Sequence, residues 1–194
     1  MITKLEQLIE AVRGRDRKTL VAAYAQDAHT LEAVSSAVDM GIVNAVLVGD
    51  RAQIAKVCAA EGIDLAKFTV VDETDDAECV NVAVRMIRDG KADVLMKGLV
   101  STDKYMRGIL NKEFGLLPPK GVLSHVAVLE LPAYHKLLLV SDVAVIPYPD
   151  FSQKVKIAGY LARTARALGI ERPKLAVVAP SEQLLTAVQS SVDA

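Results

Sequence analysis

The apolar residues of this chain follow two alternating patterns, short consecutive runs and longer segments with an apolar residue at every third or fourth position. Consecutive runs are typical of strands buried on both faces, and the longer spacing is typical of helices. The expected strands of the first part are residues 19–23, 42–48, 68–71 and 94–96. The expected helices are residues 5–12, 27–39, 74–88 and 102–111, with one more starting at Gly49-Asp50. This alternation predicts an α/β fold with a parallel sheet covered on both faces.

The pattern changes at residues 114–121, where two prolines and two glycines fall close together. Such a segment is typical of a domain boundary. We therefore expect a first α/β domain over residues 1–121, which carries the Lys97 to Thr102 motif, and a second over residues 122–194. With only about seventy residues, the second domain is expected to be incomplete.

In the second domain, three strand-like runs follow one another without a helix between them, which predicts antiparallel pairing. A long helix should then begin at Asp150 or Ser152 and end at Gly169. The three runs are residues 122–131, 136–140 and 143–146, and the later expected elements are a strand at 175–179 and a helix from 180.

Composition and charge narrow the class of protein. A chain of 194 residues with 52% hydrophobic content can form a large core. Its 23 basic and 24 acidic residues are spread along the chain, which argues against a nucleic-acid partner. We find no apolar run of membrane-spanning length and no signal-peptide core, so we expect a cytoplasmic protein without a membrane partner. Cys58 and Cys79 are expected to be buried free thiols, and the three histidines lack metal-ligand spacing.

The stretch from residue 93 to residue 111 carries the candidate chemistry. A short apolar run ends in Lys97-Gly98, and Ser101-Thr102 then open an amphipathic helix. The start of a helix offers free backbone N–H groups, and here two hydroxyls and an ammonium group are added, which together predict a phosphate site. Ligands of parallel sheets bind at the carboxyl ends of the strands, where this turn is expected. The alternative is that Ser101 and Thr102 do no more than cap the helix.

Several segments spaced along the chain resemble one known family. They are Ala22-Ala-Tyr-Ala-Gln-Asp27 with Leu31-Glu-Ala-Val34, Met96-Lys-Gly-Leu-Val-Ser-Thr102, Leu123-Ser-His-Val-Ala127, Ser141-Asp142-Val-Ala with Pro147, and Leu168-Gly169 with Arg172-Pro-Lys-Leu-Ala-Val177. In this order they resemble the phosphate acetyl/butyryltransferases, and the phosphate butyryltransferases in particular. The resemblance implies a parallel-sheet α/β sandwich of the isocitrate/isopropylmalate dehydrogenase-like type, with two domains, of which the second is incomplete here.

The resemblance also implies an activity, the reversible reaction of butyryl-CoA with phosphate to give butyryl phosphate and CoA. Coenzyme A is then a substrate, and no cofactor or metal is expected. Ser101 and Thr102 would hold the phosphate of the acyl phosphate, with Lys97 and Gly98 beside them. Ser124 matches a second phosphate-side serine and would face them across an interdomain cleft.

Two further residues are candidate contacts to phosphate or CoA. His125 adjoins Ser124, and because neighbouring side chains on a strand point to opposite faces, we assign the cleft to Ser124 and keep His125 as the alternative. Arg107 lies one and a half turns into the helix, where a solvated surface arginine is the competing interpretation. The groups that activate the CoA thiol and stabilise the oxyanion are expected beyond Ala194, so the activity of this chain is expected to be impaired.

Three alternatives to this activity arise from the sequence. Phosphate acetyltransferase activity is open because these residues do not locate the acyl pocket, and a non-catalytic module that binds phosphate or CoA is open because the second domain is incomplete. An oxidoreductase of the same superfold is disfavoured because no G-x-G-x-x-G sequence follows any strand.

Apolar surface left exposed by the incomplete domain predicts a homodimer.

Overall fold

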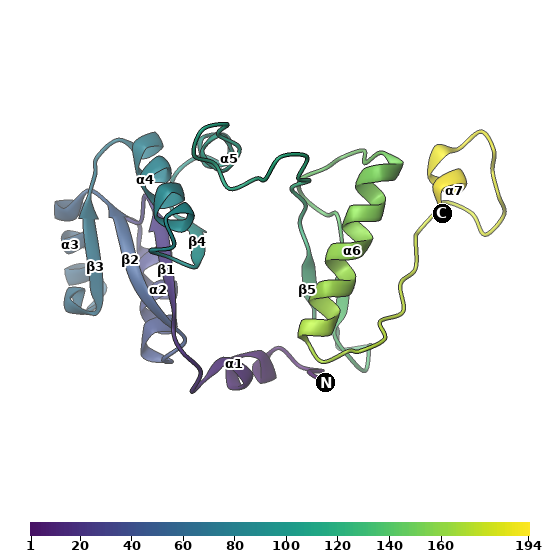
Figure 1. The fold of residues 1–194 in the computed structure, drawn as a ribbon. Coiled ribbons are helices and arrows are strands. Elements are labelled where there is room, and N and C mark those ends of the chain that lie inside the picture. Colours follow the sequence, from purple (N-terminus) through teal and green to yellow (C-terminus); the bar gives the residue numbers. More distant parts are fainter. The chain divides into compact units, whose positions relative to one another are not determined.

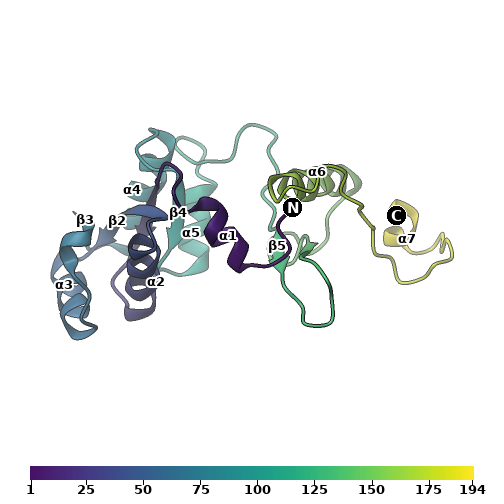
Figure 2. The ribbon, with the colours of Figure 1, turned by 90° about the horizontal axis from the view of Figure 1, so that it is seen from below.

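The computed structural model describes residues 1–194, which form two compact units (Figures 1 and 2). One unit is Ile9–Pro119, and the other combines Met1–Leu8 with Lys120–Ala194. The first eight residues therefore group with the later part of the chain and not, as the sequence suggests, with the first domain. The Glu130 carboxylate explains this grouping because it accepts a hydrogen bond from the backbone N–H of Leu5 at 2.8 Å.

The unit Ile9–Pro119 is built on a four-stranded sheet with the order β3-β2-β1-β4. All three neighbouring pairs are parallel, which confirms the predicted α/β class. Parallel strands covered on both faces need consecutive apolar residues, and the second half of β1 supplies them, since Val21, Ala22 and Ala23 are fully buried. The strands are β1 (Lys18–Ala23), β2 (Val43–Gly49), β3 (Phe68–Asp72) and β4 (Val94–Lys97).

Helices cover both faces of this sheet (Figures 1 and 2). Residues of α2 and α3 share one core cluster with the strands, and residues of α4 and α5 pack into the other. Asp27 and Asp50 cap α2 and α3, since the carboxylate of each accepts backbone N–H groups of the helix that follows. The helices of this unit are α2 (Ala28–Asp39), α3 (Arg51–Ala60), α4 (Asp76–Arg88), α5 (Thr102–Ile109) and the short 3-10 helix η1 (Leu65–Lys67).

The other unit contains a small antiparallel sheet and a long helix. Strands β5 (Ala127–Leu129) and β6 (Leu138–Val140) form the sheet, which confirms the predicted antiparallel pairing. Helix α6 (Phe151–Ala167) begins at the predicted cap, Asp150, which forms a capping box with Gln153. Helix α1 (Glu6–Val12) links the two units along the chain, and α7 (Gln189–Asp193) lies near the C-terminal residue.

Three predicted elements of this second unit are wrong. Residues 143–146 form no strand, because Asp142 accepts the backbone N–H groups of Ala144 and Val145 in a turn. Residues 175–179 are also not a strand, since no neighbouring segment pairs with them and Val178 remains 88% exposed. The helix expected from residue 180 is absent, and α7 forms nine residues later. None of the helices of the chain combines the length and apolar character that a membrane crossing requires.

Candidate functional site

The candidate phosphate motif begins where β4 ends, at the carboxyl edge of the parallel sheet (Figure 1). The backbone pairing of β4 with β1 continues past the strand, because the N–H of Gly98 donates to Ala23 at 2.9 Å and the N–H of Leu99 donates to Tyr24 at 3.0 Å. A Cβ atom at position 98 would lie 2.4 Å from the Tyr24 carbonyl oxygen. Glycine is therefore required at position 98 by the close approach of the two backbones.

The chain then enters α5 with two hydroxyl side chains. Ser101 is the N-cap, and its Oγ accepts the backbone N–H of Lys104 at 3.4 Å. This contact uses a lone pair of the oxygen, so the hydroxyl hydrogen of Ser101 is still available to a ligand. Thr102 is the first residue of the helix and is exposed. The cap interpretation and the phosphate interpretation of Ser101 are therefore compatible.

Lys97 supplies a positive charge at the same edge. Its side chain is exposed, and its Nζ donates to the backbone carbonyl of Gly98 at 3.2 Å. No carboxylate forms an ion pair with it in the structure. The structure thus places Lys97, Gly98, Ser101 and Thr102 together within one strand-to-helix turn.

Helix α5 is held in place by contacts with α4 and β4. Gly108 lies against Val80 of α4 so closely that a Cβ atom at position 108 would be 2.5 Å from Val80 Cγ1. The Tyr105 hydroxyl donates to the carbonyl of Leu95 in β4 at 3.2 Å, and burial raises the pKa of this phenol. These contacts fix the direction in which the N-terminus of α5 points.

The two basic residues of α5 are both engaged in ion pairs. Arg107, a predicted candidate contact, pairs with Asp103 one turn earlier at 3.0 Å and is 78% exposed. Lys104, which is not among the residues predicted from the sequence, contacts both carboxylate oxygens of Asp76 at 2.6 and 2.7 Å. The hydrogen bond to Asp76 raises the pKa of Lys104, so its ammonium group stays charged. The only sequence feature that could have pointed to the pair of Lys104 with Asp76 is the position of a lysine three residues after the N-cap.

Ser124 lies in the other unit and is not on a strand. Its hydroxyl donates to the Asp142 carboxylate at 2.8 Å, and the same carboxylate accepts the backbone N–H of His125 at 3.1 Å. The argument that Ser124 and His125 point to opposite faces of a strand therefore does not apply, because β5 begins at Ala127. The His125 side chain is exposed. The roles of Ser124 and His125 toward phosphate stay predictions.

Asp142 is the centre of this second cluster and was not selected from the sequence. Partial burial raises its pKa, but hydrogen bonds from the N–H groups of Val145 and Ala144, from Ser124 and from His125 outweigh that effect. The pKa of Asp142 therefore lies well below its usual range, and the carboxylate is ionised. Because Ser124 gives its hydrogen to Asp142, Ser124 can donate to a phosphate only by giving up that bond.

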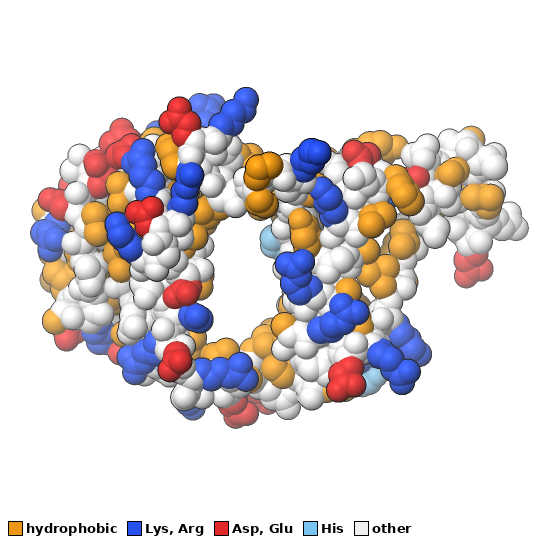
Figure 3. Space-filling model, viewed as in Figure 1, with side chains coloured by type: hydrophobic (Ala, Val, Ile, Leu, Met, Phe, Trp, Pro, Cys, Tyr) orange, Lys and Arg blue, Asp and Glu red, His pale blue; other side chains and the backbone are white.

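The remaining titratable groups offer no second site. Cys58 and Cys79 are free and buried, as predicted. Burial raises the pKa of Cys79 to about 12, so it is a thiol at neutral pH and not a nucleophile. No group of three or more His, Cys, Asp and Glu side chains is arranged to hold a metal ion. On the face shown in Figure 3, basic and acidic side chains are mixed over the unit Ile9–Pro119.

Comparison with known proteins identifies the relatives of this chain. The phosphate butyryltransferase of Clostridium acetobutylicum is 38% identical over 194 residues, which is 100% of this chain and 64% of that protein. The phosphate acetyltransferase of Thermotoga maritima is 33% identical over 178 residues, 92% of this chain and 60% of that protein. The chain thus spans less than two thirds of the length of these relatives.

A solved structure shows the same relationship. The branched-chain phosphotransacylase from Enterococcus faecalis V583 superposes with a TM-score of 0.75 at 25% identity, covering 91% of this chain and 61% of that one. The phosphate acetyl/butaryl transferase family matches residues 3–81 and 77–192. These matches cover nearly the whole sequence, so this chain belongs to the phosphate acetyl/butaryl transferase family.

Proposed function

We propose that this chain carries the phosphate-binding part of an acyltransferase that moves a butyryl or similar short-chain acyl group between CoA and phosphate. In this reaction the acyl carbon exchanges its bond to the CoA sulfur for a bond to a phosphate oxygen, and CoA leaves as the thiol. The observation that carries the proposal is the turn from β4 to α5, where a free ammonium group, two hydroxyls and a helix N-terminus lie together. The 38% identity to a phosphate butyryltransferase supports the choice of acyl group.

The physical basis of the proposed phosphate site is the sum of several weak interactions. A helix N-terminus at an exposed position stabilises an anion by roughly 0.3–1 kcal/mol, and a hydrogen bond to a charged group adds about 1.5–3 kcal/mol. In our proposal Ser101 and Thr102 donate their hydroxyl hydrogens, the first amides of α5 add dipolar attraction, and Lys97 supplies the full charge. Gly98 contributes by letting the backbone of β4 lie close to β1.

Arg107, Ser124 and His125 belong to the same proposal, and they differ in which existing contacts must open before they can bind a ligand. Arg107 reaches a ligand only if its ion pair with Asp103 opens, and Ser124 donates to a phosphate only if its bond to Asp142 opens. His125 needs no such rearrangement, because its imidazole is exposed and only its backbone contacts Asp142. We therefore expect substitution of His125 to affect turnover more than substitution of Arg107.

The helix-cap alternative can be separated from the phosphate site by substitution at one position. Asp and Asn are both good N-caps, so Ser101→Asp and Ser101→Asn should keep α5 stable. The added negative charge of aspartate should abolish binding of inorganic phosphate and butyryl phosphate, measured by calorimetry, whereas asparagine should weaken it only modestly. Phosphate binding by Ser101→Asp equal to that of the unsubstituted chain would show that Ser101 is only a cap.

Activity is tested in a full-length form of the enzyme by the release of CoA thiol from butyryl-CoA in the presence of phosphate. Ser101→Ala with Thr102→Ala should raise the KM for phosphate about 100- to 10,000-fold, since two hydrogen bonds to a charged group, about 1.5–3 kcal/mol each, are lost. Ser36→Ala, on the distant helix α2, is the control and should leave the rate unchanged. Binding without turnover would identify the chain as a phosphate-binding module.

A second acyl preference is supported by a specific finding, the 33% identity to a phosphate acetyltransferase. Initial rates with acetyl-CoA and butyryl-CoA distinguish the two enzymes. A higher kcat/KM with butyryl-CoA is the expected result, and a higher value with acetyl-CoA would replace butyryl by acetyl in the proposal.

We also infer the assembly and fold type of the whole protein. The start of α6 exposes Phe151 and Val155 at 63% and 57%, and apolar side chains on neighbouring turns of one helix are typical of a contact surface. We therefore expect a homodimer. From the family resemblance we additionally expect the isocitrate/isopropylmalate dehydrogenase-like fold, and from the sequence a cytoplasmic protein. A monomeric mass in light scattering would contradict the dimer.

A further inference from the structure

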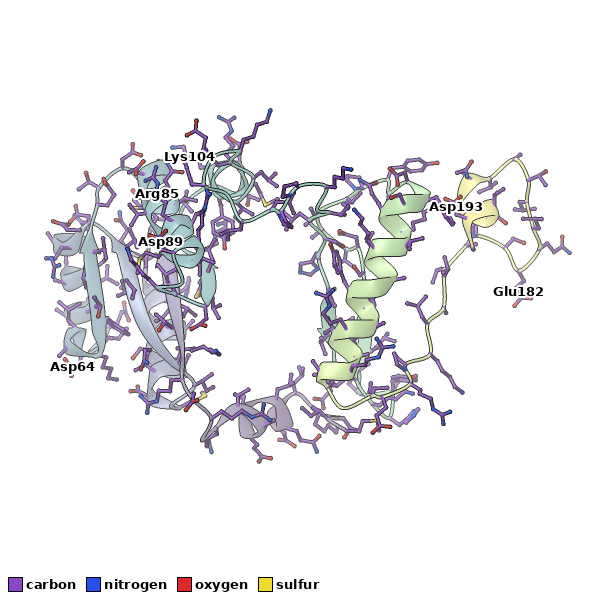
Figure 4. The ribbon with its side chains drawn as sticks, viewed as in Figure 1. Asp64, Arg85, Asp89, Lys104, Glu182 and Asp193 are labelled. Carbon is purple, nitrogen blue, oxygen red and sulfur yellow. The ribbon has the colours of Figure 1, made fainter.

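The ion pair between Lys104 and Asp76 lies beside the proposed phosphate site. Lys104 is in the first turn of α5, three residues after Ser101, and Asp76 is the first residue of α4. The Lys104 Nζ atom is 2.6 and 2.7 Å from the two carboxylate oxygens of Asp76. Both side chains remain accessible, with 44% of Lys104 and 27% of Asp76 exposed (Figure 4 labels Lys104). Ligands in solution can therefore reach this pair.

The charges of Asp76 and Lys104 interact in opposite ways with the dipoles of their own helices. A negative charge at the start of a helix is stabilised by the helix dipole, and a positive charge there is destabilised. Asp76 is thus favoured by α4 whether or not Lys104 is present. Lys104, in contrast, is disfavoured by α5 and depends on an anion close by. An anion bound at the start of α5 would meet this need as well as Asp76 does.

Neighbouring acidic groups are already engaged elsewhere. The Asp75 carboxylate caps α4 by accepting the backbone N–H of Glu78 at 2.8 Å, and Asp103 pairs with Arg107. Lys97 has no carboxylate partner. A phosphate anion at the start of α5 therefore has one free ammonium group, that of Lys97, and one that is hydrogen-bonded to a single carboxylate, that of Lys104.

We propose that Lys104 is a second cationic residue of the proposed phosphate site and that Asp76 is a counter-ion which holds it until phosphate takes its place. This inference rests on the proposed function, because it concerns the same ligand. Asp76 then lowers the affinity for phosphate by competing for Lys104. The pair sets the phosphate affinity without any contact between Asp76 and the ligand.

A double-mutant cycle measures this competition. Binding of inorganic phosphate and of butyryl phosphate is determined by calorimetry at one low ionic strength for Asp76→Asn, Lys104→Gln and the double variant. Asp76→Asn should tighten binding about fivefold and Lys104→Gln should weaken it about fivefold, the factor for one unit charge at contact distance in water. In the Lys104→Gln background, Asp76→Asn should have no effect, because Asp76 acts through Lys104.

A matched control removes the same charge from the same helix. Glu78 is in the first turn of α4, but its partner is Arg85, at 2.7 Å. Glu78→Gln should change phosphate affinity less than twofold. The α4 cap is Asp75, so Asp76→Asn leaves it intact, and thermal melts confirm that each variant is folded.

The outcomes separate this inference from the proposed function. If the unsubstituted chain binds phosphate but Asp76→Asn has no effect, the counter-ion role is wrong and the site at Ser101 stands. If Asp76→Asn tightens binding equally with and without Lys104, Asp76 repels phosphate directly and the inference is also wrong. If neither the unsubstituted chain nor Asp76→Asn binds phosphate or butyryl phosphate, the proposed site and this inference both fall.

Discussion

Two glycines inside helices are predicted to respond in opposite ways to the same substitution. Gly108 lies near the end of α5, where an added Cβ atom would be 2.5 Å from Val80 Cγ1. Gly159 lies in the middle of α6, where an added Cβ atom would meet nothing within 4 Å. In a helix interior, alanine is more favourable than glycine by about 0.8–1 kcal/mol. Packing decides whether that gain is realised.

At position 108 the packing cost should exceed the gain. Carbon atoms pack at about 3.5–4.0 Å, so the overlap with Val80 is on the order of 1 Å. Val80 is fully buried and, as a β-branched residue in a helix, has one strongly preferred rotamer, so it cannot turn away. Overpacking typically costs about 1–3 kcal/mol, and we expect Gly108→Ala to lower the free energy of unfolding by about 1–2 kcal/mol. Gly159→Ala should raise it by about 0.5–1 kcal/mol.

The assay is urea unfolding, with hydrogen exchange measured peptide by peptide to assign each change to its unit. Adding Val80→Ala should relieve the overlap, so the double variant with Gly108→Ala should lose less stability than the sum of the two single changes, by about 1 kcal/mol. Phosphate binding gives a second measure, since displacement of α5 should weaken it. Equal stabilisation by Gly108→Ala and Gly159→Ala, or strict additivity with Val80→Ala, would refute the reasoning.

Three further predictions concern backbone contacts of the two units. Gly98→Ala should destabilise the unit Ile9–Pro119 by about 1–3 kcal/mol in urea unfolding, because the added carbon meets backbone atoms of Ala23 and Tyr24, and an unchanged midpoint would contradict this. The pKa of Asp142 is lowered in the folded state, so its contribution is complete above the ordinary aspartate value of about 4 and is lost as pH falls below it. The stability difference between the unsubstituted chain and Asp142→Asn should therefore shrink below about pH 4, and a difference that grows there would reverse our sign. Asp150→Ala removes the capping box of α6 and should cost about 0.5–2 kcal/mol, whereas Ser152→Ala, one residue inside the helix, should cost little.

The sheet of the unit Ile9–Pro119 could be predicted because each of its strands carries its own evidence. The apolar run at residues 19–23 predicts a buried strand, because a strand covered on both faces needs apolar side chains on both. Asp27 indicates the start of the next helix, because its own side chain caps that helix. The same kind of apolar run misled at residues 143–146 and 175–179. A strand also needs a partner strand, and the presence of a partner is not encoded within the run itself.

The arrangement of the candidate residues could be predicted as far as it depends on neighbours in sequence. Ser101 is recognisable because an N-cap precedes its own helix by one position. Lys104 and Asp76 are 28 positions apart, and they meet only because Gly108 lets α5 lie close to α4. Ser124 and Asp142, 18 positions apart, likewise meet through the folding of irregular segments. Contacts of this kind depend on packing, which no local pattern reports.

The continuation of the β1–β4 ladder through Gly98 and Leu99 has a consequence for the entropy of the proposed phosphate binding. A loop that is free before binding loses conformational entropy when a ligand orders it, at a cost of roughly 1–2 kcal/mol for each residue fixed. The backbone ahead of Ser101 is already fixed by the central strand of the sheet, and Val100 is buried in the core. The motif is therefore preorganised, so that folding of the sheet, and not arrival of the anion, orders this turn.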